Sequence, residues 1–198
     1  MYDETIILCG LHLTILARHK NKRLSKEDVP LSGVDANKSF ILQALNTTEP
    51  VWLKKSSCNH FPYEPQHICV YSSTVYLNAT DYSFNQTYYY GPIRNSSHFY
   101  GKFYDFGKGM DPVMTVSLEQ GGEGINYTLR YINASEHCGV LTYEDEDGVE
   151  CGLHVWNDSV RKPLQGCETA FKTICNGTAY DLFFENCTAR SGNSIEVV

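Results

Sequence analysis

Asparagine-linked glycosylation is the chemistry that this chain's residue pattern indicates most directly. Ten of its 13 asparagines begin a sequon, Asn-x-Ser/Thr with no proline in the middle. With 29 Ser and Thr among 198 residues, chance would give about two sequons. The sequon asparagines are Asn37, Asn46, Asn78, Asn85, Asn95, Asn126, Asn133, Asn157, Asn176 and Asn186. This density predicts a secreted, extracellular glycoprotein.

Cysteines are the second group of residues whose side chains could form bonds or bind a metal. The chain has eight: Cys9, Cys58, Cys69, Cys138, Cys151, Cys167, Cys175 and Cys187. The oxidising compartment that the sequons require predicts that most of them form disulfides. Cys58, His60, His67 and Cys69 also offer four zinc-type ligands, but oxidation would remove the thiolates that zinc needs. We therefore predict disulfides and no metal.

Signals for catalysis are weak. The chain has no Gly-x-Ser-x-Gly motif and no phosphate-binding glycine loop. The acidic run before Gly148 is typical of a hairpin tip and lacks the spacing of a calcium loop. His154 could act as a general base, but inward histidines more often belong to a cavity or a core. We predict a protein that is not an enzyme and uses no cofactor.

The length and net charge of the chain limit the classes of partner that it could bind. A chain of 198 residues fits one domain with a sizeable core. Its net charge of −7 argues against nucleic acid and anionic membrane surfaces as partners. The 14 tyrosines, against two tryptophans, favour strands and a partly polar interior. We expect a monomer that binds a small molecule.

The N-terminal segment is expected to lie outside the folded domain. Ile6 to Ala17 is mainly apolar and too short to span a bilayer. Asp3 and Glu4 precede it, where a signal peptide has basic residues. We predict an atypical signal or leader over 1–24, a linker over 25–34, the domain over 35–190 and a tail over 191–198. A buried or surface-lying helix retained in the mature protein is the alternative.

The rest of the chain alternates strand patterns with turn residues. Asp35 to Leu45 predicts a short helix, and Pro163 to Thr173 a second one. Eight strands are predicted: Val51 to Lys55, Ile68 to Leu77, Tyr82 to Tyr90, His98 to Phe106, Val113 to Leu118, Asn126 to Ile132, Gly139 to Glu144 and Glu150 to Trp156. Short strands at this spacing indicate an antiparallel barrel or sandwich.

The sequons also label strand faces, because side chains alternate between faces and a glycosylated asparagine must point at solvent. Asn85, Asn126 and Asn157 serve as labels. They predict that these side chains point inward: Phe84, Gln86, Tyr88, Tyr90, Tyr127, Leu129, Tyr131, His154 and Trp156. Several hydroxyls and an imidazole suit a ligand cavity better than a solid core. Strand bulges that shift the register, or ordinary core tyrosines, are the alternative.

Two labels conflict with each other. Asn126 and Asn133 are seven residues apart, so both cannot face outward from one regular strand. We predict that Asn133 begins a turn, because Asn-Ala-Ser-Glu is rich in turn residues. Otherwise Arg130 faces inward.

The order of several short segments resembles a known family. Cys138-Gly-Val-Leu-Thr-Tyr143, Leu153-His-Val-Trp156 and Phe183-Phe-Glu-Asn-Cys187 are similar to segments of the tick salivary lipocalins of the histamine-binding protein family. The resemblance covers roughly 35–188. It implies an all-β fold: an eight-stranded antiparallel up-and-down lipocalin barrel with a short N-terminal helix and a C-terminal helix packed outside. It also implies capture of small host mediators of inflammation.

The resemblance implies two disulfides as well, Cys69 with Cys187 and Cys138 with Cys167. Cys151 and Cys175 then remain as a third pair, from the last strand to the end of the helix. Cys58 is left over. It would pair with Cys9, join another molecule or stay free.

The chain differs from the family at residues that determine which class of ligand is bound. Two acids that pair with amines in the family are replaced by Gly139 and His154, and an unpaired buried ammonium is costly. In the regions of the other acids the chain has His60, Tyr63, Glu64 and Lys102, of which only Glu64 could substitute. This favours a lipid mediator. The predicted lining is Trp52, Tyr88, Tyr100, Lys102, Tyr127, Tyr131, His154 and Trp156.

Within that lining, His154 and Lys102 are expected to orient the polar end of the ligand. A solvated strand lysine is the alternative for Lys102. Two other functions stay open. One is binding of histamine or serotonin through acids whose positions do not align with those of the family, and the other is a glycosylated protein with a vestigial cavity that binds a host protein.

Overall fold

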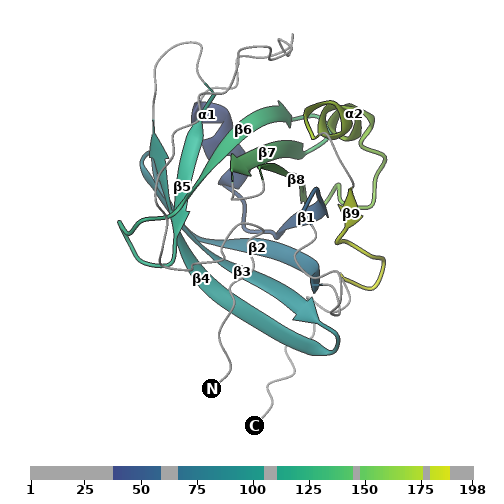
Figure 1. Ribbon diagram of the computed structural model, residues 1–198, viewed down its shortest axis with the longest axis horizontal. Helices are drawn as coiled ribbons and strands as arrows, with labels where there is room; N and C mark the ends of the chain where they lie inside the picture. Colours follow the sequence, from purple (N-terminus) through teal and green to yellow (C-terminus); the bar gives the residue numbers. More distant parts are fainter. Residues whose placement is uncertain (1–37, 59–66, 105–110, 145–147, 176–178, 188–198) are drawn as a thin grey trace.

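Eight strands form a closed antiparallel barrel. The computed structural model describes residues 38–58, 67–104, 111–144, 148–175 and 179–187. The barrel strands are β1 (Val51–Ser56), β2 (His67–Leu77), β3 (Asp81–Tyr90), β4 (Ile93–Tyr104), β5 (Val113–Ser117), β6 (Ile125–Asn133), β7 (Cys138–Glu144) and β8 (Val149–Trp156). Each strand pairs with the next, and β1 pairs with both β8 and β2 (Figure 1). The predicted eight-stranded up-and-down barrel is confirmed.

Strand β4 is longer than predicted. It begins at Ile93, directly after the Gly91-Pro92 turn, and not at His98. The added residues include Asn95, which pairs with Tyr88 of β3. The residues added at the start of β4 are mostly polar and resemble a loop in sequence, but pairing with β3 keeps them extended. Asn95 therefore lies within a strand, where its side-chain direction is fixed.

The helix α1 (Lys38–Leu45) lies against one end of the barrel. The indole Nε1 of Trp156 donates to the carbonyl oxygen of Ala44 at 2.8 Å, and Oγ1 of Thr74 donates to that of Leu45 at 3.0 Å. Ile41 is buried with the interior side chains. We call this the α1 end, and the opposite end, where β1 ends and β2 begins, the far end.

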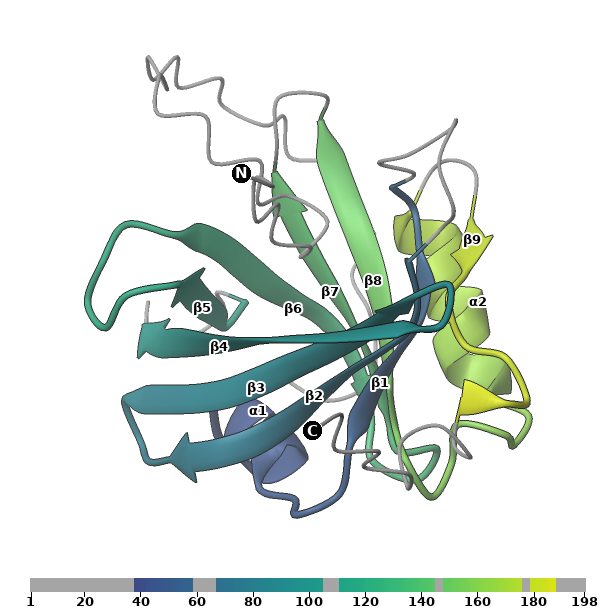
Figure 2. The ribbon, with the colours of Figure 1, turned by 90° about the horizontal axis from the view of Figure 1, so that it is seen from below.

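The helix α2 (Gln165–Ile174) packs on the outside of the barrel. It contacts β6, β7 and β8, and Figure 2 shows it on the opposite side of the molecule from β4 and β5. A short strand, β9 (Tyr180–Asp181), follows it and pairs with β1. Cys167, Ala170 and Phe171 of α2 are buried against the outer face of β7 and β8. Neither α1 nor α2 is long and apolar enough to cross a membrane.

Three disulfides fasten this outer layer. Cys138–Cys167 joins β7 to α2, Cys151–Cys175 joins β8 to the end of α2, and Cys69–Cys187 joins β2 to the C-terminal segment. These are the pairs expected from the resemblance and from the two cysteines left over. Cys58 is also disulfide-bonded, and Cys9 lies outside the described residues.

A carboxylate holds the start of α2. The cap residue Leu164 makes no side-chain cap hydrogen bond. Instead, the N–H groups of Gly166 and Cys167 each donate to the carboxylate of Glu136 at 2.9 Å. A carboxylate at this position satisfies free N–H groups and interacts favourably with the helix dipole. Glu136 therefore ties the turn between β6 and β7 to α2.

A bulge in β6 reconciles the two conflicting sequons. Leu129 pairs with Leu141, but Tyr131, two residues later, pairs with the adjacent Val140, so the register shifts at Arg130. The extra residue lets Asn126 and Asn133 both point outward. The Asn133 Oδ1 accepts hydrogen bonds from the N–H groups that follow it, and it begins the predicted turn.

The disulfides give a prediction about stability. We expect replacement of Cys151 and Cys175 by alanine to lower the free energy of unfolding by about 3 kcal/mol, because these cysteines are 24 residues apart. Loss of Cys69–Cys187, whose partners are 118 residues apart, should cost about 1 kcal/mol more. Urea unfolding of both variants tests this. A smaller loss for the longer loop would contradict the loop-entropy account.

Candidate ligand-binding site

The interior has an apolar wall formed by β3, β4 and β5. Its side chains are at most 7% exposed and form one cluster: Phe84, Phe99, Phe103, Met114 and Val116. The rings of Phe84 and Phe99 stack with centroids 5.5 Å apart. This wall offers mainly hydrophobic contact, and two residues of β3 on the same face, Tyr82 and the buried Gln86, add hydrogen-bonding groups.

Four of the eight predicted lining residues lie on the interior face: Tyr88, Tyr127, His154 and Trp156. Tyr88 alternates with the buried Phe84 and lies near the far end, where its ring meets His67 edge-on at 4.9 Å. Trp156 lies at the α1 end, where it bonds to Ala44. The four residues are thus spread along the length of the barrel.

The prediction that Trp52 lines the cavity is wrong. This residue is fully buried, but on the outer face of β1. Its ring lies 4.8 Å from that of Tyr71 and 5.0 Å from that of Phe183, and its Nε1 donates to Oδ1 of Asn157 at 2.9 Å. The C-terminal segment covers this face, so burial here does not mean an interior position.

Tyr100 and Lys102 also lie outside the barrel. Phe99 and Phe103 belong to the interior cluster, so the residues that alternate with them face outward. Lys102 is exposed, which is the solvated position that the sequence left open as an alternative. The expected anchoring of a ligand by Lys102 inside the barrel is therefore wrong.

Tyr131 lies outside because of the bulge. After the shift at Arg130 it pairs with Val140, an outward residue packed under α2. A methyl group on Gly166 of α2 would lie only 3.0 Å from the Tyr131 hydroxyl oxygen. The predicted inward position of Tyr131 followed from a regular strand, and the added residue reverses it.

Polar side chains gather on the opposite wall, near the far end. Tyr127 and Tyr143 lie on adjacent strands with ring centroids 5.1 Å apart, and Glu150 of β8 pairs with Tyr143. The Tyr127 hydroxyl is buried and has no hydrogen-bond partner among the described residues. Burial raises the pKa of this hydroxyl above its ordinary value, so it is protonated. We call these three residues the polar layer.

Glu150 is the site residue that the sequence reasoning missed. Cys151 points outward to its disulfide with Cys175, so Glu150 points inward with His154. One carboxylate oxygen accepts a hydrogen bond from Oγ of Ser57. The alternation that placed His154 and Trp156 inward also reaches Glu150, which was the available signal.

His154 lies deeper in the barrel than the polar layer. It pairs with Gly139 and Leu53, and a methyl group on Gly152 would lie 2.9 Å from its Nε2. Part of the side chain stays accessible, and this surface faces the interior. Burial lowers the pKa of His154 to about 4, so the imidazole is neutral at pH 7. A neutral imidazole can exchange one hydrogen bond with a ligand but offers it no charge.

The metal alternatives find no support in the described residues. Cys69 and Cys58 are disulfide-bonded, so neither offers a thiolate for zinc. Glu136 lies close to the sulfurs of Cys138 and Cys167. Those sulfurs form a disulfide, and the carboxylate binds helix N–H groups. His60, Tyr63, Glu64 and Asp147 lie outside the described residues.

Comparison with known proteins supports the fold. The model of the tick histamine binding protein family matches residues 35–189. Among solved structures, Japanin from Rhipicephalus appendiculatus bound to cholesterol is 18% identical, with a TM-score of 0.55 over 71% of this chain and 96% of that one. The AM182 serotonin complex is 16% identical, with a TM-score of 0.51 over 74% and 91%. No curated protein sequence matches.

The neutral His154 gives a prediction about acid stability. Its lowered pKa means that between pH 6.5 and about 4 the unfolded chain binds a proton that the folded chain does not. Stability from this residue is therefore full above pH 6.5 and is lost as the pH falls. We expect wild type to lose about 2 kcal/mol more than His154→Gln between pH 7 and 4.5.

Urea unfolding at both pH values measures this difference. His98→Gln, on the outer face of β4, controls for the loss of an imidazole. Equal acid sensitivity of wild type and His154→Gln would show that His154 is solvated.

Proposed function

The chain belongs to the tick histamine-binding protein family, and we propose that it is a secreted lipocalin that sequesters a small host mediator in its barrel. The ligand we favour is a mainly apolar mediator, such as a lipid, with an uncharged polar group. Its apolar body would pack on the wall of β3, β4 and β5. Capture and not turnover is the mechanism, and it would blunt inflammatory or haemostatic signalling.

The observation that carries this proposal is the unpartnered hydroxyl of Tyr127, which has no hydrogen-bond partner within the described part of the chain. A buried polar group without a partner costs about 1–3 kcal/mol. Tyr127 faces the interior with Leu129 and Tyr143, so a ligand there would meet both a hydroxyl and hydrophobic surface. An aliphatic hydroxyl or carbonyl would accept its hydrogen bond and recover that cost.

The charges inside the barrel favour an uncharged ligand over an acidic one. With Lys102 outside and His154 neutral at pH 7, no interior cation among the described residues would pair with a carboxylate. Glu150 would repel one. Among lipid mediators, acidic ones are therefore less favoured than neutral ones.

Secretion is supported by two independent features. The ten sequons are acceptors only in the secretory pathway. The disulfides Cys69–Cys187, Cys138–Cys167 and Cys151–Cys175 are typical of proteins from oxidising compartments. Within this proposal, residues 1–24 are a leader and 35–190 are the domain that reaches the host.

A conservative variant tests the neutral-ligand proposal. We expect Tyr127→Phe to weaken binding of a neutral lipid with one hydroxyl about 10-fold, because one hydrogen bond is lost and the ring is kept. Calorimetric titration of delipidated secreted protein with a panel of neutral and acidic lipids gives the affinities. Tyr100→Phe, on the outer face, is the matched control. Unchanged affinity in Tyr127→Phe would rule out this hydroxyl as the anchor.

A biogenic amine is the second candidate, and Glu150 is the observation that favours it. Its carboxylate lies on the interior face opposite Tyr143, and tyrosine rings attract cations. Of the two structural neighbours, the AM182 complex holds serotonin and Japanin holds cholesterol. Both ligand classes are therefore compatible with the fold.

The carboxylate supplies the test of amine binding. If an amine is the ligand, Glu150→Gln should weaken histamine or serotonin binding at least about 30-fold, because a buried ammonium loses its counter-charge. Glu144→Gln, exposed at the end of β7, is the control. If the wild-type protein bound neither amine, the amine hypothesis would be rejected and the neutral ligand would remain.

Binding of a host protein by the outside of the barrel is the least supported alternative. It would need a large apolar surface patch free of sequons. The large apolar side chains that are exposed in the described part of the chain are Val75, Tyr76, Ile93, Tyr104, Val149 and Phe184. They come from β2, both ends of β4, β8 and the C-terminal segment, a distribution that does not favour a single docking patch.

A further inference from the structure

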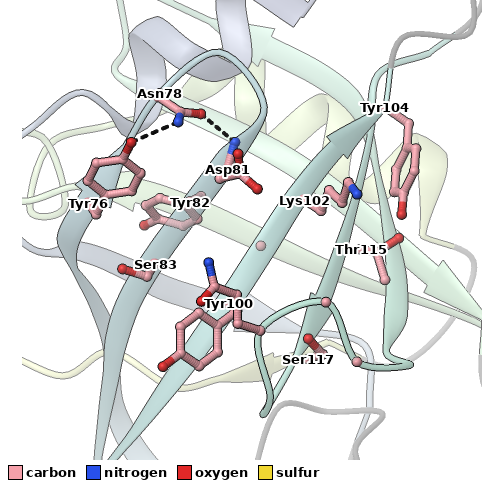
Figure 3. Close-up of a pocket in the computed structure, with 14 residues that line it drawn as sticks. Tyr76, Asn78, Asp81, Tyr82, Ser83, Tyr100, Lys102, Tyr104, Thr115 and Ser117 are labelled. Atoms are coloured by element: carbon pink, nitrogen blue, oxygen red, sulfur yellow. Dashed lines mark hydrogen bonds between the residues drawn. The ribbon is translucent and has the colours of Figure 1, made fainter.

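A separate groove of about 550 Å³ lies on the outer surface, on the side away from α2. Its floor is the outward face of β3, β4 and β5 (Figure 3). Tyr76, Tyr100 and Tyr104 lie around it, and Lys102 and Asp81 bring one charge of each sign. The groove is on the opposite face of these strands from the apolar interior wall.

Asn78, the head of the Asn78-Ala-Thr80 sequon, lies at the rim of this groove (Figure 3). Its Oδ1 accepts hydrogen bonds from the N–H groups of Thr80 at 2.8 Å and Asp81 at 2.6 Å. Its Nδ2 donates to the hydroxyl of Tyr76 at 2.8 Å. The Thr80 hydroxyl also donates to Oδ1 at 3.2 Å. Four hydrogen bonds thus fix the amide beside the groove, and Nδ2 keeps one proton that no hydrogen bond of the described residues uses.

We propose that the glycan attached to Asn78 folds back into this groove and is bound there. Attachment joins Nδ2 to C1 of the first sugar and breaks the bond of that sugar to the diphosphate of a lipid-linked oligosaccharide, while Nδ2 gives up one proton. The other proton stays on the hydrogen bond to Tyr76. The inference rests on the proposed secretion, because that pathway supplies the donor.

The chemistry of the groove fits sugars. The C–H faces of a pyranose ring pack on tyrosine rings, and its hydroxyls both donate and accept hydrogen bonds. Asp81 accepts, Lys102 donates and Ser83 does both, and all three line the groove. One positive and one negative side chain suit a neutral, hydroxyl-rich ligand better than an ion.

A covalent tether explains how so open a groove holds a ligand. Sites for free small molecules bury about 70–90% of the ligand surface, whereas this groove is only partly enclosed. A glycan anchored at the rim has an effective concentration of about millimolar. Weak contacts that could not retain a free sugar are then enough.

Asn85 provides an internal comparison. It lies on the same outer face, where its Oδ1 is 2.7 Å from Nδ1 of His98. It does not line the groove. A glycan on Asn85 should therefore extend into solvent, and enzymes that trim glycans should reach it freely.

The experiment uses the full chain secreted from eukaryotic cells, with glycopeptide mass spectrometry at each sequon. We expect Asn78 to be occupied, to keep mainly untrimmed high-mannose glycans, and to be cut by an endoglycosidase at least about 5-fold more slowly than Asn85 in the native protein. Lys102→Ala with Tyr104→Ala keeps the sequon and should abolish both differences. Lys172→Ala with Tyr180→Ala, on the α2 side, is the matched control.

The outcomes separate this inference from the proposed function. An unoccupied Asn78 beside occupied neighbours, or trimming and cleavage at Asn78 equal to those at Asn85, would overturn the docked glycan and leave secretion and capture intact. A secreted protein without glycan on any sequon would overturn the docked glycan and remove the sequons as support for secretion, while ligand capture would still be judged by the titrations. Differences that persist in Lys102→Ala with Tyr104→Ala would place the protection outside the groove and would also reject the inference.

Discussion

The two-residue alternation of side chains in a closed sheet is the constraint on which ligand capture, helix packing and glycan attachment all depend. Closure gives every strand one interior and one exterior face, so a single residue position decides whether a side chain meets a ligand, a helix or a glycan. In β8, Cys151 and the residues two positions away from it face α2, while Glu150 and His154 face the interior. The disulfides to α2 then hold that assignment in place, because they require the cysteine face to be outside.

Much of this arrangement could be predicted from the sequence because its signals are local. Turn residues marked the eight strands, and the outward asparagines of two sequons, Asn85 and Asn157, gave the correct interior faces of β3 and β8. The label at Asn126 was correct for Tyr127 but not for Tyr131. A bulge adds one residue without a distinct sequence signal, so the conflict between Asn126 and Asn133 was visible but its cause was not.

The other wrong predictions concern residues whose position inside or outside the barrel depends on contacts with residues distant in sequence. Trp52 is buried by Tyr71 and Phe183, which no local pattern connects to it. Lys102 was left without a label because its strand begins earlier than its residues suggest, and the only sequon in that strand, at Asn95, lies on the interior face. The assumption that a sequon asparagine faces outward fails at Asn95. The far end of the β3–β4 hairpin extends past β5, so a residue there can be on the interior face without being enclosed by the barrel.

The two ligand classes differ in which interior group already has a partner. Glu150 accepts a hydrogen bond from Ser57, whose Oγ also accepts one from the N–H of Cys151, so the carboxylate is already stabilised without a ligand. Tyr127 has no partner among the described residues, and a ligand acceptor would recover about 1–3 kcal/mol there. An amine must instead lose its own hydration to reach a carboxylate that is already solvated by the protein. The unmet hydrogen bond of Tyr127, and not the charge of Glu150, is therefore the stronger reason for a ligand at this layer.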